Sequence, residues 1–410
     1  MSGSDGGARA GFLDGVRVLE LSQFVPGPFA GLLLADLGAD VVKVEEPGRG
    51  DPSRHIGPFP GGEPHPEKSG TYLYLNCNKQ GITLDLRDPR GQELLYRLAA
   101  DADVLVHTHP PREAAALGLD YQRLGEVNPR LVMASISPFG QSGPYRDYKA
   151  CDITTASAGG WTWINGWPDH PEMPPLKAFG PQTEYQAGVN AAVASLGALF
   201  WRLRSGRGQH IDVSAQECIT AIIEMTYTFW PYMQMPAVRW GQRPIHPVDF
   251  FQCKDGGWIF VLCIEEAQWR RFVELMGNPE WATWEVFADR LVRAANYDAL
   301  RPFLAEWVSQ WDSDDLYRAA QERRIPFAPA STIADLLDSP HLKARGFFVE
   351  VAHPQTGTLK YPGAPYKLSG TPWQIRSPAP TLGQHNEAIL GGRLGLSPEE
   401  LRSLQETGVV

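Results

Sequence analysis

Residues 15–54 read GVRVLELSQFVPGPFAGLLLADLGADVVKVEEPGRGDPSR, and the order of apolar and turn-forming residues in this stretch decides the fold. The apolar run at 16–19 is typical of a buried strand, and residues 22–28 contain the prolines and glycine of a turn. Residues 29–37 have the pattern of a helix that stops before a glycine, and the β-branched run at 41–44 predicts a second strand. This strand–helix–strand unit predicts a parallel sheet, in which ligands bind beyond the carboxyl ends of the strands.

The same alternation of strands and helices continues along the chain. The Asp88–Pro89 pair is a typical start for the helix that follows it. An Asp-Gly-Gly turn at 255–257 lies between two apolar runs and predicts a hairpin. Further strands are expected at 82–86, at 104–106 and after Asn128, helices at 91–99, 184–203 and 218–232, and the hairpin at 250–263.

Composition and charge exclude several classes of partner. The chain has 410 residues and a formal net charge of -10, which argues against nucleic acid or an anionic membrane surface as the main partner. No apolar run is long enough to cross a bilayer, and the first residues lack the apolar core of a secretory signal. The five cysteines are scattered, and the pair His107 and His109 has no nearby ligand cluster, so we expect a cytoplasmic protein with reduced thiols and no metal site.

Five separated motifs are similar to those of the family III CoA-transferases, the group of formyl-CoA transferase, the carnitine-linked CoA-transferases and the α-methylacyl-CoA racemases. The first block combines LELSQFVPGP (19–28) and LADLGADVVKVEEPGRGD (34–51). The other four are LNCNKQGITLDL (75–86), RSGRGQHIDVS (204–214), IPFAPASTIADLLDSPHLKARGFFVEV (325–351) and PAPTLGQHNEAIL (378–390). They occur in the family's order and cover nearly the whole chain.

The resemblance implies a fold, an assembly and a class of reaction. It implies an α/β fold in which a parallel sheet flanked by helices forms a Rossmann-like large domain, joined to a smaller α+β domain in an interlocked homodimer. Residues 1–225 would form the CoA-binding part, 235–325 the small domain, and 326–410 a segment that returns to the large domain. The substrates would be an acyl-CoA and a carboxylic acid, with no permanently bound cofactor.

The resemblance places the catalytic nucleophile at the start of the helix after an aromatic loop. The family has an aspartate there, four residues before a glycine, and the matching residue in this chain is Glu184. A carboxylate at that position can attack a thioester and hold the acyl group as an anhydride. The racemases of the family use a histidine that precedes an aspartate, and here Cys151 stands before Asp152. We expect Glu184, Gln23 and Asp152 to take part in catalysis, and Cys151 to pack as a small apolar residue.

The CoA-binding positions of the family can be assigned one by one in this chain, and some of them hold a different type of residue. The loop after the first strand would line the pantetheine and thioester, Leu84 would lie beside the adenosine, and Lys149 would contact a phosphate. The residues assigned to CoA are Gln23, Phe24, Val25, Pro26, Leu84, Thr108, His109 and Lys149. Two cationic positions of the family are occupied by Glu46 and Ala116, and Arg49, Arg54 and Arg112 are the candidates to replace the lost charges.

Three functions remain open on the sequence. The first is an acyl-CoA:carboxylate CoA-transferase that works through an enzyme-bound anhydride and thioester. The second is an acyl-CoA racemase or isomerase in which Cys151 and Glu184 move the α-proton. The third is a non-catalytic subunit of a hetero-oligomeric CoA-transferase, which the loss of the aspartate and of the basic residues would explain.

Overall fold

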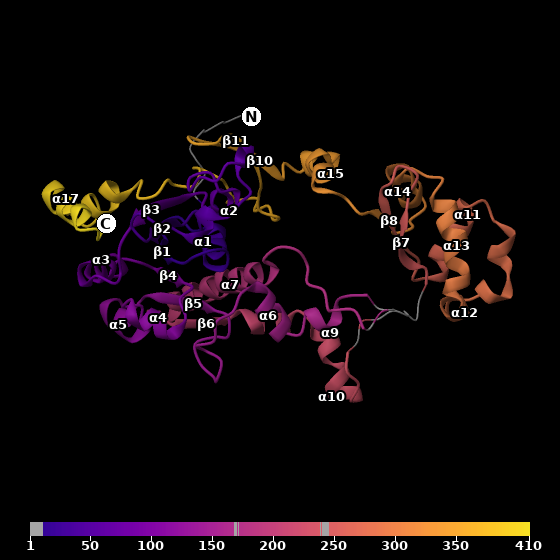
Figure 1. Cartoon of the computed structure of the whole chain (residues 1–410), viewed down its shortest axis with the longest axis horizontal. Coiled ribbons are helices and arrows are strands. Elements are labelled where there is room, and N and C mark those ends of the chain that lie inside the picture. Colours follow the sequence, from indigo (N-terminus) through magenta and orange to yellow (C-terminus); the bar gives the residue numbers. More distant parts are fainter. Residues whose placement is uncertain (1–10, 168–169, 171, 238, 240–245) are drawn as a thin grey trace. The chain divides into compact units, whose positions relative to one another are not determined.

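The computed structural model describes residues 11–167, 170, 172–237, 239 and 246–410, and it divides the chain into two compact units (Figure 1). The first unit comprises Met1–Gly166, Pro175–Ala237 and Phe347–Val410. The second comprises Trp167–Pro174 and Val238–Gly346. Within the described residues, no helix has the length and apolar character needed to cross a membrane.

A six-stranded parallel sheet forms the centre of the first unit, as the strand–helix–strand pattern predicts. The strand order is β3-β2-β1-β4-β5-β6, so the order reverses between β1 and β4. A reversal of this kind opens a crevice at the carboxyl ends of the two strands. The strands are β1 Arg17–Leu21, β2 Asp40–Glu45, β3 Lys79–Thr83, β4 Val104–His107, β5 Val132–Ser137 and β6 His210–Ser214.

Helices cover both faces of this sheet. Successive strand residues point to opposite faces, so each strand contributes side chains to two cores. Val18 and Val41 face a core that contains apolar residues of α1 (Pro26–Asp36) and α7 (Gln182–Ser205). Leu19 faces the opposite core, which α3 (Pro89–Ala99), α5 (Tyr121–Val127), a π-helix at Glu387–Gly391 and α17 (Pro398–Glu406) help to form. The predicted fold class, a parallel sheet flanked by helices, is therefore confirmed.

Shorter elements complete the first unit, and one predicted helix is broken. The other elements are α2 Gly70–Leu75, α4 Pro111–Ala116, α6 Asp152–Ala158, α8 Ala215–Ala221, α9 Glu224–Tyr227, α10 Phe229–Met233 and the antiparallel pair β10 Phe348–His353 and β11 Gly357–Pro362. The single helix predicted over 218–232 is wrong, since α8, α9 and α10 share this segment. The β-branched pair Ile222–Ile223 and Pro231, which lacks a backbone donor, both disfavour one continuous helix.

The second unit is built on a three-stranded antiparallel sheet with helices around it. The predicted hairpin is confirmed, because β7 (Val248–Gln252) pairs with β8 (Trp258–Leu262), and β9 (Ala328–Pro329) adds to β8. Its core contains Phe272, Leu304 and Phe327. The helices are α11 Glu266–Leu275, α12 Arg290–Ala295, α13 Tyr297–Val308, α14 Ser313–Glu322, α15 Ile333–Asp338 and α16 Pro340–Ala344.

Helix α1 begins three residues earlier than the sequence pattern predicts, and this start shapes the site. The segment expected as a turn contributes Pro26 and Pro28 to the first helical turn. Proline is tolerated there, because the first N–H groups of a helix have no intrahelical partner. Gly38, with a φ of 114°, follows the helix as predicted and lets the chain reverse into β2. The start of α1 therefore lies directly after the loop that leaves β1.

Candidate active site

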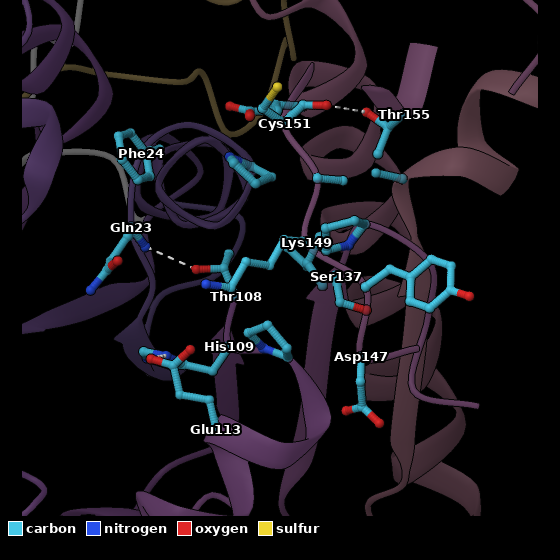
Figure 2. Close-up of a pocket in the computed structure, with 18 of the residues that line it drawn as sticks. Gln23, Phe24, Thr108, His109, Glu113, Ser137, Asp147, Lys149, Cys151 and Thr155 are labelled. Carbon is cyan, nitrogen blue, oxygen red and sulfur yellow. Dashed lines mark hydrogen bonds and ion pairs between the residues drawn. The ribbon is translucent and has the colours of Figure 1, made fainter. Parts of the chain in front are cut away.

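A cavity of about 780 Å³ lies at the carboxyl ends of β1, β4 and β5, where the strand order reverses (Figure 2). The loops after these strands and the first turn of α7 supply its lining. The predicted site residues that line it are Gln23, Phe24, Pro26, Thr108, His109, Lys149 and Glu184. Residues from four separate segments of the sequence thus meet around one space that is large enough for a small organic molecule.

Glu184 reaches this cavity from the first turn of α7 and is half-buried. Burial, and then the nearby Asp152 carboxylate, raise the pKa of Glu184 to about 7, while Lys177 acts in the opposite direction. The carboxyl group is therefore poorly solvated and close to its titration point at neutral pH. Poor solvation makes a carboxylate more reactive toward an electrophilic carbonyl carbon.

Asp152 is hydrogen-bonded to the turn of α7 that carries Glu184. One carboxylate oxygen, Oδ1, accepts hydrogen bonds from the backbone N–H of Thr183 at 2.8 Å and of Glu184 at 3.4 Å. The other oxygen lies 2.5 Å from Nζ of Lys177. Asp152 thus caps the N-terminus of α7 and fixes the turn that carries Glu184. The sequence marked Asp152 but gave no signal for Lys177, which lies 25 residues away in an irregular loop.

The segment after β1 forms one wall of the cavity through Gln23, Phe24 and Pro26. The backbone N–H of Gln23 donates to Oγ1 of Thr108 at 3.0 Å, so the loops after β1 and β4 are joined (Figure 2). Val25 is buried and lies outside the lining of the cavity. The structure therefore brings three of the four predicted loop residues to the cavity and gives Val25 a place in the core.

A smaller cavity of about 160 Å³ adjoins the first and shares Gln23, His109 and Glu113 with it. Leu84 lines this second space, together with Glu46 and Arg87. Arg87 lies 2.7 Å from the Glu46 carboxylate, so a cation does stand near the position where the family pattern has one. The predicted adenosine contact, Leu84, therefore lies beside the main cavity and not within it.

The cations that could hold phosphate groups differ in their availability. Arg54 is fully buried against Glu45 and Glu67, so it is not available to a ligand. Arg112 and Lys149 line the main cavity, are exposed, and have no ion-pair partner among the residues that the structure describes. Of the candidates for replacing the lost charges, Arg112 is the one in the cavity.

His107, the last residue of β4, holds the loop that carries His109. Burial lowers the pKa of His107 to about 3, so its ring is neutral, and its Nδ1 accepts the backbone N–H of His109 at 3.2 Å. Nε2 of the same ring lies 2.6 Å from Oγ of Ser135, a neighbour on β5.

No group of three or more His, Cys, Asp or Glu side chains suited to a metal ion occurs in the described parts of the chain.

Cys151 does not pack as a small apolar residue, and that expectation is wrong. Its side chain is exposed and lines the cavity that also contains Glu184. The hydroxyl of Thr154, 3.5 Å from Sγ, is the first cause that lowers the pKa of this thiol. The residue precedes the first turn of α6, and a loop position of this kind leaves the thiol open to the ligand space.

Comparison with known proteins defines the class of protein. The sequence pattern of CoA-transferase family III matches residues 13–386. The succinyl-CoA–D-citramalate CoA-transferase of Chloroflexus aurantiacus is 35% identical over 402 residues, which cover 97% of this chain and 98% of that protein. The formyl-CoA:oxalate CoA-transferase of Streptomyces coelicolor is 32% identical over 417 residues, which cover 97% and 99%.

A solved structure gives the same result for the fold. A CAIB/BAIF family protein from Brucella suis superposes with a TM-score of 0.85 at 32% identity, over 94% of this chain and 100% of that one. The chain belongs to CoA-transferase family III, and the resemblance stated from its motifs is confirmed. The protein is thus a CoA-transferase, an enzyme whose substrates are CoA thioesters.

Proposed function

We propose that this enzyme moves CoA from an acyl-CoA to a free carboxylic acid through covalent intermediates on Glu184. The observation that supports this most directly is the half-buried Glu184 carboxylate in the wall of the 780 Å³ cavity, with a pKa of about 7. A poorly solvated carboxylate is suited to nucleophilic attack on a thioester. The side chain of Gln23 lines the same space, and its amide N–H is suited to stabilise an oxyanion.

The chemistry balances without a cofactor. An oxygen of Glu184 attacks the thioester carbonyl carbon, and the C–S bond breaks. This step releases CoA as a thiolate and leaves the acyl group joined to Glu184 as a mixed anhydride. The thiolate then attacks the Glu184 carbonyl carbon, which releases the donor acid and forms a glutamyl-CoA thioester. The acceptor carboxylate attacks this thioester to form a second anhydride, and the thiolate converts it to the new acyl-CoA and free Glu184.

Trapping the enzyme-bound species tests this proposal. After incubation with an acyl-CoA donor, hydroxylamine converts a glutamyl anhydride or thioester to a hydroxamate, and borohydride reduces it to an alcohol. We expect peptide mass spectrometry to find the label at Glu184, and only when acyl-CoA is present. A donor that is turned over while Glu184 stays unlabelled would contradict the covalent mechanism.

The pH dependence of the reaction follows from the pKa of Glu184. Only the carboxylate is a nucleophile, and a pKa raised to about 7 means that this form is lost as pH falls through 7. We expect kcat/KM to fall about tenfold per pH unit below that value, whereas an ordinary glutamate would stay ionised down to about pH 4.5. Asp152→Asn removes the nearest like charge, so its profile should shift to lower pH. A profile that is flat from pH 5 to 8 would contradict this assignment.

The phosphate groups of CoA are proposed to meet Arg112 and Lys149, the exposed cations of the cavity. A charge-assisted hydrogen bond is worth about 1.5–3 kcal/mol, so Arg112→Gln or Lys149→Gln should weaken CoA binding by roughly 10- to 150-fold. Calorimetric titration measures this, and pantetheine, which lacks the nucleotide phosphates, should bind all variants equally. Arg49→Gln, which changes an exposed partner of Glu46, is the matched control and should bind CoA as the wild type does.

An assembly of two copies is proposed from the exposed apolar side chains of α7 and α10. Phe200 and Leu203 of α7 and Tyr232 of α10 are 61%, 78% and 83% exposed in the single chain. Large apolar side chains with this much exposure occur at interaction surfaces, and the family resemblance suggests that the partner is a second copy. Light scattering should give twice the chain mass of 45.3 kDa, and a monomer at micromolar concentration would contradict it.

A racemase reaction has one observation in its favour, since Cys151 and Glu184 line the same cavity. Thiol and carboxyl groups on two sides of an α-carbon could remove and return a proton. Incubation with a chiral acyl-CoA in deuterated water, without an acceptor acid, distinguishes the two functions. Deuterium at the α-carbon would support the racemase, and its absence together with CoA transfer would support the transferase.

A further inference from the structure

Phe24, in the loop after β1, has a backbone conformation that needs external support. Its φ is 58°, in the left-handed region that non-glycine residues avoid at a cost of roughly 1–2 kcal/mol. The side chain is 41% exposed, so packing of the ring does not provide the compensation. The residue lines the cavity beside Gln23, and the left-handed turn separates β1 from the start of α1 (Figure 2).

One buried carboxylate holds this turn. Oδ1 of Asp51 accepts the backbone N–H of Phe24 at 3.1 Å and that of Ser53 at 2.8 Å. The backbone N–H of Asp51 donates to Oε2 of Glu45 at 2.8 Å, so the residue is fixed to the end of β2. Asp51 is only 2% exposed. A rigid acceptor of this kind can select one conformation of the loop that it contacts.

The charge of Asp51 is balanced by a lysine that also contacts the end of β1. Nζ of Lys43 lies 2.9 Å from Oδ2 of Asp51 and 2.9 Å from Oε1 of Glu20, and it donates to the carbonyl oxygen of Ser22 at 3.0 Å. Lys79 adds the second positive charge, 2.7 Å from Glu20. These four side chains are fully shielded from solvent or nearly so, and their charges cancel. The network ties three parallel strands to the loop that lines the cavity.

We propose that Asp51 is a positioning residue for the CoA-transfer reaction. It holds Phe24 in the left-handed conformation and thereby presents Gln23, Phe24 and the start of α1 to the cavity that contains Glu184. Asp51 lines the smaller cavity and not the one that contains Glu184, and its proposed action on the reaction passes through the backbone N–H of Phe24. The part of this inference that concerns catalysis rests on the proposed function, and the part that concerns the loop does not.

Two substitutions separate the hydrogen bond from the charge. Asp51→Asn keeps an oxygen that can accept the N–H of Phe24, and Asp51→Ala keeps none. We expect Asp51→Ala to lower kcat by about a hundredfold, with a much smaller change in KM for acyl-CoA, because a catalytic group displaced by about 1 Å loses that much rate. Asp51→Asn should retain kcat within about fivefold, although its midpoint of urea denaturation falls. Equal kcat losses in the two variants would overturn the proposal.

A double-mutant cycle tests the link to the backbone of Phe24. Glycine adopts a positive φ without steric cost, so Phe24→Gly removes the strain that Asp51 is proposed to hold. The loss of kcat caused by Asp51→Ala should be at least about fivefold smaller in the Phe24→Gly background than in the wild type. An identical loss in both backgrounds would overturn the proposal.

Glu67→Gln controls for a general loss of stability. Glu67 pairs with Arg54 at 2.6 Å and accepts the N–H of Leu382, and it takes no part in the hydrogen bonds that join Asp51 to Phe24 and Ser53. This variant should shift the denaturation midpoint and leave kcat unchanged. A fall in kcat comparable to that of Asp51→Ala would show that instability alone explains the effect, and would overturn the proposal.

Hydrogen exchange distinguishes failure of the loop argument from failure of the proposed function. In the wild type the N–H of Gln23 and of Phe24 are both bonded to side chains, so a peptide that spans residues 22–26 should be protected. Asp51→Ala should speed exchange in that peptide at least tenfold and leave β4 and β5 unchanged. If no acyl-CoA is turned over but this result holds, the function fails and the positioning of the loop stands. If exchange is unchanged in Asp51→Ala, the inference fails whatever the activity.

Discussion

Glu184→Gln is expected to abolish CoA transfer, with a fall in kcat of at least about a thousandfold. Removal of the nucleophile leaves only binding and oxyanion stabilisation, and losses of that size or larger are usual for such changes. Glutamine has nearly the same shape, and the turn of α7 around residue 184 is held by Asp152 through backbone N–H groups that the substitution does not alter. The loss should therefore be chemical and not structural.

The measurement is the initial rate of product acyl-CoA formation, together with CoA affinity and hydroxylamine labelling. We expect CoA to bind Glu184→Gln within about threefold of the wild type, because this amide makes no proposed phosphate contact, and we expect no label at residue 184. A variant that keeps a tenth of the wild-type rate would show that Glu184 is not the nucleophile.

The shorter Glu184→Asp variant restores the family residue and tests how far the site has adapted to glutamate. Its carboxylate would withdraw by about one methylene, and a displacement near 1 Å can cost on the order of a hundredfold. We expect a rate well below the wild type but above Glu184→Gln, with hydroxylamine labelling retained at residue 184. A fully active aspartate variant would mean that the cavity tolerates both lengths.

The sequence predicted most of the framework, because the signals were local. Strand and helix patterns identified β1, α1 and β2, and the motif match selected Gln23, Thr108 and five more of the residues that line one cavity in the structure. Prolines obscured one boundary, since Pro26 reads as a turn residue but occupies the first turn of α1. Patterns of this kind are visible without any knowledge of tertiary contacts.

The supporting residues could not be predicted, because their partners are distant in the sequence. Asp51 acts on Phe24, 27 positions earlier, and Lys177 acts on Asp152 across an irregular loop, so no periodicity links either pair. Arg54 shows the opposite error. It was a candidate ligand for phosphate on its charge alone, and only the fold reveals that its guanidinium is buried against carboxylates.

Arg54→Met is expected to lower the free energy of unfolding by about 3–5 kcal/mol, the range observed when one partner of a buried ion pair is removed. Nε and Nη2 of Arg54 bind Glu45 at 2.7 and 2.8 Å, Nη1 binds Glu67 at 2.6 Å, and Nη2 also donates to the Tyr72 hydroxyl at 2.6 Å. Methionine fills similar space but leaves the Glu45 carboxylate, which is 1% exposed, without its cation. Urea denaturation measures the change.

The cause of that loss can be separated from lost packing by a second substitution. If the unpaired carboxylate is responsible, Glu45→Gln added to Arg54→Met should recover stability, because the buried charge is removed along with its partner. Arg87→Met changes an exposed arginine 2.7 Å from Glu46 and should leave the denaturation midpoint almost unchanged. A double variant less stable than Arg54→Met would mean that the packing and hydrogen bonds of Arg54 outweigh its charge. Recovery would show that the unpaired charge of Glu45, and not lost packing, causes the fall in stability.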